Sequence, residues 1–231
     1  MDACLKRGPR HLPNQDIALP LPKPLEATLI VAICFGWFIA SSIAAVASGF
    51  PASSETFSDG SLVGLILIEL ALGAIALAVL RFRGYALADL LPTPTWQGCA
   101  IGVLLFIVTT LAWGAVAQCF PADAFAHQPI ADMVSGKRVT LPVVIALSMV
   151  NGLYEETFLL GYLMRGFRAA GPSLAIGLSV LVRVMYHLYQ GPLGAVSVLV
   201  YGLVVGLFYW RTGRLWPAVF AHTLADALAL A

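Results

Sequence analysis

Long apolar runs, separated by short polar stretches, dominate the chain after its first 24 residues. A helix that crosses a membrane needs about 20 mostly apolar residues. The last three runs are the shortest, and Gly-Pro pairs or a proline mark their boundaries. We expect an all-α, polytopic integral membrane helical bundle of about seven transmembrane helices. The predicted spans are residues 26–48, 61–81, 97–120, 139–164, 173–189, 193–210 and 215–230.

The same pattern divides the chain into three parts. Residues 1–24 are polar and proline-rich and predict a disordered cytoplasmic tail. Residues 25–138 carry the N-terminal transmembrane helices, the first of which is expected to act as a signal anchor. Residues 139–231 carry the remaining helices and most of the ionisable residues that lie within apolar runs.

Composition supports a membrane protein. Of the 231 residues, 60% are hydrophobic and 11% are charged, whereas a soluble domain has about 25% charged residues. Mean hydropathy is +0.89. Membrane lipid is therefore an expected partner, and the net charge of +1 gives no indication of a nucleic-acid partner.

Arginine pairs predict the orientation of the helices. A pair follows the second, the fourth and the sixth predicted span, and positively charged loops usually stay in the cytoplasm. The pattern predicts a cytoplasmic N-terminus, and we expect a bacterial plasma membrane. The arginines are Arg81, Arg83, Arg165, Arg168, Arg211 and Arg214.

Ionisable residues within the spans are the strongest functional signal, because a charge near the bilayer centre costs at least a few kcal/mol. Glu69 has no partner close in sequence and is expected to be structural or neutral. The other six fall in the last four spans. They are Glu155, Glu156, Arg183, His187, His222 and Asp226.

Spacing indicates that these residues meet. Three helices each carry two polar residues four positions apart, which puts both on one helix face. In a bilayer such faces must turn toward each other or toward a water-filled cavity. The spacing predicts one buried polar centre. Its members are Asn151 and Glu155, His187, and His222 and Asp226.

The adjacent Glu155 and Glu156 lie about 100° apart around a helix. We therefore expect Glu155 to face the polar centre and Glu156 to take a separate partner. Arg183 is the cation within the spans and is the natural candidate for that partner.

A carboxylate and a neutral imidazole can activate a water, and a second imidazole can stabilise an oxyanion. This chemistry suits hydrolysis of a peptide or ester bond without a cofactor. Neither a G-x-S-x-G motif nor an H-E-x-x-H motif occurs. A Zn²⁺ site on Glu155, His187 and His222 is the alternative, because two histidines and a glutamate can bind zinc.

The segments "EETFLLGYLMRGF", "RVMYHLYQG" and "GLVVGLFYWRTGRLWPAVFAHTLAD" resemble the CPBP family of intramembrane proteases, which includes the Rce1-like CAAX prenyl endopeptidases and the Abi proteins. The resemblance covers about residues 140–231 and implies that they form the catalytic core. It implies that Glu155 activates water, that His187 helps to hold the water, and that His222 and Asp226 form the oxyanion hole.

Two positions depart from the family pattern. The first motif is usually E-E-x-x-x-R, but Leu160 holds the arginine position. The second motif often has Phe where this chain has Arg183. We expect Arg183 to replace the lost cation from another helix and to satisfy Glu156, with Glu156, Arg183 and Asn151 supporting the catalytic residues.

The predicted function is an intramembrane endopeptidase of the glutamic type, a class often labelled metalloprotease. Its substrate is expected to be a membrane-associated protein or peptide, of which a prenylated CAAX protein is one kind. Two alternatives remain at this stage: a proton- or ion-relay membrane protein, and a non-catalytic membrane scaffold. Because position 160 lacks the arginine of the family motif, the non-catalytic scaffold remains an alternative function.

Overall fold

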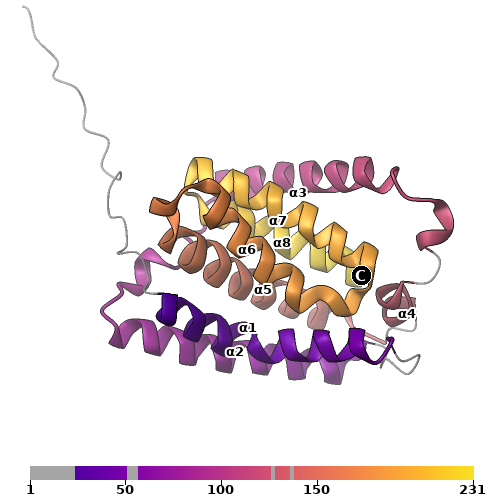
Figure 1. Ribbon diagram of the computed structural model, residues 1–231, viewed down its shortest axis with the longest axis horizontal. Helices are drawn as coiled ribbons and strands as arrows, with labels where there is room; N and C mark the ends of the chain where they lie inside the picture. Colours follow the sequence, from indigo (N-terminus) through magenta and orange to yellow (C-terminus); the bar gives the residue numbers. More distant parts are fainter. Residues whose placement is uncertain (1–23, 51–56, 126–127, 136–137) are drawn as a thin grey trace, which may run out of the picture.

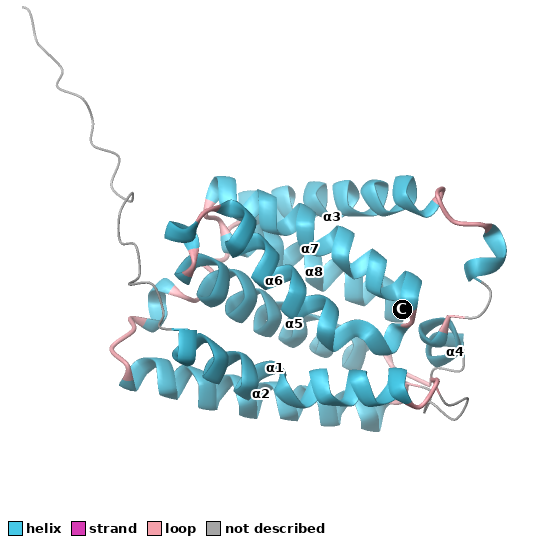
Figure 2. Ribbon diagram, in the orientation of Figure 1, coloured by secondary structure: helices cyan, strands magenta, loops and turns pink. Residues whose placement is uncertain are grey.

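A computed structural model describes residues 24–50, 57–125, 128–135 and 138–231. The described residues fold into helices that lie side by side, and they contain no strand (Figures 1 and 2). The predicted tail lies outside the described residues except for Pro24, which begins α1. The helices are α1 Pro24–Ala47, α2 Asp59–Phe82, η1 Leu87–Asp89, α3 Trp96–Ala117, η2 Ala122–Phe125, α4 Pro129–Ser135, α5 Leu141–Glu156, η3 Thr157–Met164, η4 Arg168–Ala170, α6 Pro172–His187, η5 Leu188–Gln190, α7 Pro192–Thr212 and α8 Leu215–Leu230.

Six helical segments among the described residues are long and apolar enough to cross a membrane, counting α5 with η3 and α6 with η5 as one segment each. The seventh predicted span is α8, an apolar helix of 16 residues. At 1.5 Å per residue it is about 24 Å long, shorter than a hydrocarbon core of about 30 Å. The fold is therefore the predicted polytopic helical membrane bundle, with a short last helix.

Side-chain exposure agrees with a lipid-facing surface. Leu67 and Leu70 on α2, and Leu104 and Leu111 on α3, are exposed although they lie in the middle of apolar helices. Soluble helices turn such residues toward a core. Here the outer faces are apolar as well, which is the pattern expected for contact with lipid tails.

The segment formed by α5 and η3 lies in the middle of the bundle (Figure 1). It packs against α2 on one side, against α8 on the other, and against α6. All eight residues of η3 are buried. This segment is the one expected to carry the two glutamates, so the bundle encloses them from several directions.

The turns before α6 and α7 depend on glycine. Gly171 and Gly191 have φ values of +94° and +89°, in the region that side chains with a Cβ rarely adopt. Pro172 and Pro192 then begin α6 and α7, where the missing N–H of proline has no cost. The Gly-Pro pairs thus mark both helix starts, as the sequence predicts.

The predicted arginine pairs gather at one end of the bundle. Arg83, after α2, forms an ion pair at 2.6 Å with Glu26 at the start of α1. Arg165 donates to the carbonyl of Asp89. Arg168 donates to the carbonyl of Trp210 at the end of α7, at 2.8 Å. This end of the bundle is the positively charged one.

Candidate active site

Three helices bring the predicted polar residues together. The α5 helix contributes Asn151, Glu155 and Glu156. The α6 helix contributes Arg183 and His187 near its end, and α8 contributes His222 and Asp226. A close approach of α5 to α8 makes this possible. A Cβ added to Gly152 would lie 2.9 Å from Oγ1 of Thr223, so only glycine allows this spacing.

Arg183 is the cation of this cluster and is 1% exposed. Its Nη2 donates to both oxygens of Glu156, at 2.9 Å and 2.8 Å. The predicted pairing of Arg183 with Glu156 is therefore confirmed.

The expectation that the two glutamates have separate partners is wrong. Nη1 of Arg183 also donates to Oε2 of Glu155 at 3.0 Å. The guanidinium has several donors fixed in one plane, so it reaches two carboxylates on neighbouring parts of α5 at once. Arg183 binds one oxygen of Glu155 and both oxygens of Glu156.

Leu160 shows why the cation comes from another helix. It is 1% exposed and belongs to an apolar cluster with Ala218, Val219 and Ala221 of α8. It also lies in η3, where the chain leaves the α-helical spacing for a π-helix directly after Glu156. Leucine suits this apolar contact, and the carboxylates are neutralised from α6.

His222 connects the two glutamates with the last helix. Its Nδ1 lies 2.7 Å from Oε1 of Glu156, and since a carboxylate accepts, Nδ1 carries the proton. Its Nε2 lies 3.8 Å from Oε2 of Glu155 and 3.5 Å from Oδ2 of Asp226. His222 therefore sits within reach of all three carboxyl groups, and Glu156 orients its ring.

Asp226 has an amide partner. Nδ2 of Asn151 donates to Oδ2 of Asp226 at 2.7 Å. The contact joins α5 to α8 one turn away from Glu155 and His222. The predicted i,i+4 pairs of these two helices thus face each other directly.

His187 completes the predicted set from the end of α6. Its Nδ1 lies 2.9 Å from the carbonyl oxygen of Arg183. A carbonyl only accepts, so Nδ1 donates, and Nε2 is left as the acceptor nitrogen of the neutral ring. An imidazole held in this way can accept a hydrogen bond from water.

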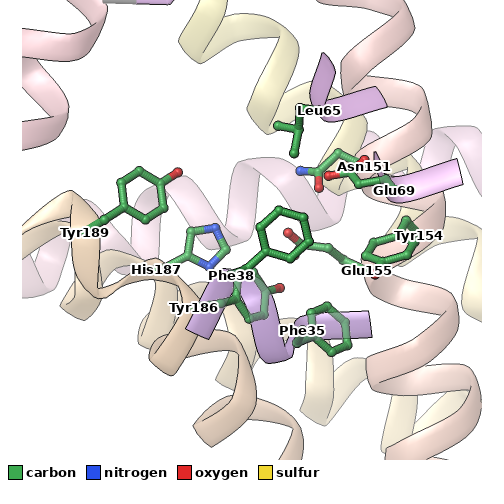
Figure 3. Close-up of a pocket in the computed structure, with 10 residues that line it drawn as sticks. All are labelled: Phe35, Phe38, Leu65, Glu69, Asn151, Tyr154, Glu155, Tyr186, His187 and Tyr189. Atoms are coloured by element: carbon green, nitrogen blue, oxygen red, sulfur yellow. The ribbon is translucent and has the colours of Figure 1, made fainter. Parts of the chain in front are cut away.

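Glu155 and His187 border a cavity of about 90 Å³. This volume exceeds the space that one water needs, and the wall includes several polar groups. Figure 3 shows both side chains among the residues that line this cavity. The cavity is lined by Phe35, Phe38, Leu65, Glu69, Asn151, Tyr154, Glu155, Tyr186, His187 and Tyr189.

Sequence reasoning missed two neighbours of the site. The ring of Tyr201 on α7 lies 5.3 Å from the guanidinium carbon of Arg183 and 5.4 Å from the ring of His222. A tyrosine in an apolar run gives no specific signal. The second is Glu69 on α2, which lines the cavity. The sequence shows it as an acid within a span, but nothing in the sequence linked α2 to this site.

A metal ion fits this arrangement poorly. Donor atoms of Glu155, Glu156 and His222 lie within 4.8 Å of one another, so Glu156 takes the place that the sequence assigned to His187. However, Arg183 already occupies three oxygens of the two glutamates, and Nδ1 of His222 is bonded to Glu156. A cation would have to displace the guanidinium from these carboxylates.

The comparisons with known proteins agree with the resemblance found in the sequence. Residues 137–228 match the family model described as type II CAAX prenyl endopeptidase Rce1-like. No curated protein and no solved structure matches the chain. The match covers α5 to α8 and with them every residue of the buried polar cluster. Residues 137–228 are thus similar to the Rce1-like type II CAAX prenyl endopeptidases, and the long apolar helices identify the chain as an integral membrane protein.

Proposed function

We propose that this protein is a glutamic-type intramembrane endopeptidase in which Glu155 activates the attacking water. One observation supports the proposal most strongly: Glu155 belongs to the buried cluster and also lines a cavity large enough for water, which His187 lines as well. A carboxylate that is held on one side and open to a cavity on the other has the arrangement that a general base needs.

Each of the neighbouring side chains has one role in the proposed reaction. Glu155 accepts a proton from the water while Nε2 of His187 holds that water by accepting its second hydrogen. The water oxygen attacks the substrate carbonyl, and the charge moves to the carbonyl oxygen. His222, when protonated at Nε2, donates to this oxyanion. Asp226 balances the charge of the imidazolium.

Arg183 and Glu156 hold the catalytic groups in place. Arg183 fixes one oxygen of Glu155, and Glu156 fixes the ring of His222. Positions must be held to within a fraction of an ångström for efficient catalysis. We assign a positioning role to both residues.

The proposed substrate is a membrane-associated protein or peptide, and a prenylated protein with a C-terminal CAAX sequence is the first candidate, which the family description suggests. The arginines at one end of the bundle support a cytoplasmic position for that end and for the N-terminus. A bacterial plasma membrane fits this assignment.

A scaffold or an ion relay is less well supported. The missing arginine of the first motif was the reason to consider a scaffold, and Arg183 supplies that cation here. A relay needs polar groups that lead to both membrane faces. Among the described residues, Glu155, Glu156, Arg183 and His222 form one buried cluster, and the buried Glu69 lines the same cavity as Glu155.

The test compares purified wild type with Glu155→Gln in detergent. The substrates are a farnesylated peptide that ends in a CAAX sequence, the same peptide without the lipid, and a membrane-tethered peptide. We expect cleavage by wild type, loss of cleavage in Glu155→Gln, and no effect of a chelator. Cleavage by Glu155→Gln at the wild-type rate rejects the proposed base. Loss of wild-type activity with chelator, restored by Zn²⁺, rejects the metal-independent mechanism.

A further inference from the structure

The cavity has one acid that the proposed mechanism does not yet use. Glu69 comes from α2, outside the segment matched by the family model, and it lines the cavity together with Glu155. Figure 3 shows Glu69 and Asn151 on the same part of the wall. A second carboxyl group therefore borders the cavity in which Glu155 is proposed to activate water.

The backbone holds Glu69 toward the interior of the bundle. The buried residues of α2 recur at intervals of three, four or seven and form one stripe, to which Glu69 belongs. Gly73, one turn later, lies so close to α5 that an added Cβ would come 3.3 Å from the ring of Tyr154. Glu69 therefore lies on the face of α2 that packs against the rest of the bundle.

Glu69 has an unused oxygen. The residue is 3% exposed, and its Oε2 has no hydrogen-bond partner among the described residues. Buried polar atoms are nearly always paired, and an unpaired one calls for a specific explanation. A leucine would fill the same position without this cost. An acid with a free oxygen at a cavity wall is suited to act on a ligand in that cavity.

We propose that Glu69 is a further catalytic residue, which protonates the leaving nitrogen of the cleaved peptide bond. This inference rests on the proposed function of Glu155. It assigns two carboxyl groups to two separate proton transfers, with Glu155 as the base and Glu69 as the acid.

Over one turnover, Glu155 and Glu69 both return to their starting protonation states. The attacking water gives one proton to Glu155, and its oxygen forms a bond to the carbonyl carbon. When the intermediate collapses, the oxyanion re-forms the C=O bond, the C–N bond breaks, and Glu69 transfers its proton to the departing nitrogen. Glu69 is then ionised and Glu155 is protonated. A proton passes back from Glu155 to Glu69 through water in the cavity.

The test uses two substrates that differ at one atom. One is the farnesylated CAAX peptide, and the other replaces the cleaved amide with an ester. An amine leaves only when it is protonated, whereas an alkoxide leaves more easily. General acid catalysis contributes about 10²- to 10⁴-fold, so Glu69→Gln is expected to lower kcat on the amide at least about 100-fold and to leave kcat on the ester within about threefold.

Leu65→Ala is the matched control, because Leu65 lines the same cavity from the same helix, one turn away. It is expected to affect the amide and the ester to the same degree. An equal loss on both substrates in Glu69→Gln overturns the proposal in favour of a structural role. Unchanged cleavage of the amide overturns it as well.

Glu155→Gln separates this inference from the proposed function. The proposed function requires that Glu155→Gln no longer cleaves either substrate. If Glu155→Gln cleaves neither substrate while Glu69→Gln cleaves both at the wild-type rate, the role of Glu155 as the base is supported and the role of Glu69 as the acid is rejected. If wild type and Glu155→Gln cleave both substrates at the same rate, the proposed role of Glu155 is rejected, and the role of Glu69 is rejected with it.

Discussion

Arg183 and Glu156 form a two-point ion pair across the α5–α6 interface, with Nη2 of Arg183 at 2.9 Å and 2.8 Å from the two carboxylate oxygens. Both side chains are buried. The pair places the cation of this site on a different helix from the one that the usual family motif uses.

Removal of Arg183 should be strongly destabilising. Arg183→Leu leaves two buried carboxylates without their cation, and loss of one partner of a buried pair costs about 3–5 kcal/mol. Glu156→Gln in the same background removes one of these charges, so the double variant should lose less than the sum of the single losses. Thermal unfolding in detergent measures this coupling.

Arg211→Leu is the control for that comparison, because Arg211 is an exposed arginine at the end of α7. It should change stability by less than about 0.5 kcal/mol. Additive losses in the Arg183 and Glu156 variants would show that the two residues do not depend on each other.

Tyr201 should stabilise the site through its ring. The guanidinium of Arg183 lies over that ring at 5.3 Å, and desolvated contacts of this kind contribute up to about 2 kcal/mol. Tyr201→Phe keeps the ring and should unfold near the wild-type temperature. Tyr201→Leu should unfold at a lower temperature. Equal unfolding temperatures of the two variants would exclude a contribution from the ring.

Gly152 should not tolerate a side chain. In Gly152→Ala the new Cβ would lie 2.9 Å from Oγ1 of Thr223 and 3.1 Å from the carbonyl oxygen of Val219, and would push α5 away from α8. Overpacking of this kind costs about 1–3 kcal/mol. The peptide cleavage rate should fall too, because the contact between His222 and Glu156 depends on this approach. Unfolding and cleavage assays measure both effects.

Gly177→Ala is the matched control for Gly152→Ala. It lies in α6, and an added Cβ would meet no atom within 4 Å. Alanine favours a helix over glycine by about 1 kcal/mol, so this variant should be at least as stable as wild type. Equal behaviour of the two alanine variants would contradict the close packing at Gly152.

Asn151 and Asp226 should be exchangeable. Asn151→Asp alone puts two carboxyl groups where an amide now donates at 2.7 Å, and should lower the cleavage rate. Adding Asp226→Asn restores one amide and one carboxyl group at the same contact. The double variant is therefore expected to cleave faster than Asn151→Asp. A double variant as slow as the single one would exclude this contact as the cause.

The sequence predicted the order of the long apolar helices because apolar runs and Gly-Pro boundaries are local signals, but it did not predict the short helix α4. It also predicted that Arg183 meets Glu156, since a buried cation and a buried acid each need a partner. These inferences follow from the cost of polar groups in a membrane, which applies before any tertiary contact is known.

Other features depended on contacts between distant segments. The sharing of Arg183 by both glutamates follows from the reach of one guanidinium between α5 and α6. The bond of His222 to Glu156, and not to Glu155, depends on how closely α8 approaches α5. Glu69 has no motif around it, and its place at the cavity depends on how α2 packs.

The source of the oxygen in the product tests the central claim most directly. Enzyme in excess over the farnesylated CAAX peptide is allowed one turnover in water enriched in ¹⁸O, and mass spectrometry measures the new carboxyl group. Attack by a water activated at Glu155 predicts one ¹⁸O atom in the product of the first turnover. A first product without ¹⁸O would mean that the carboxylate itself attacks the substrate, and would contradict the proposed role of Glu155.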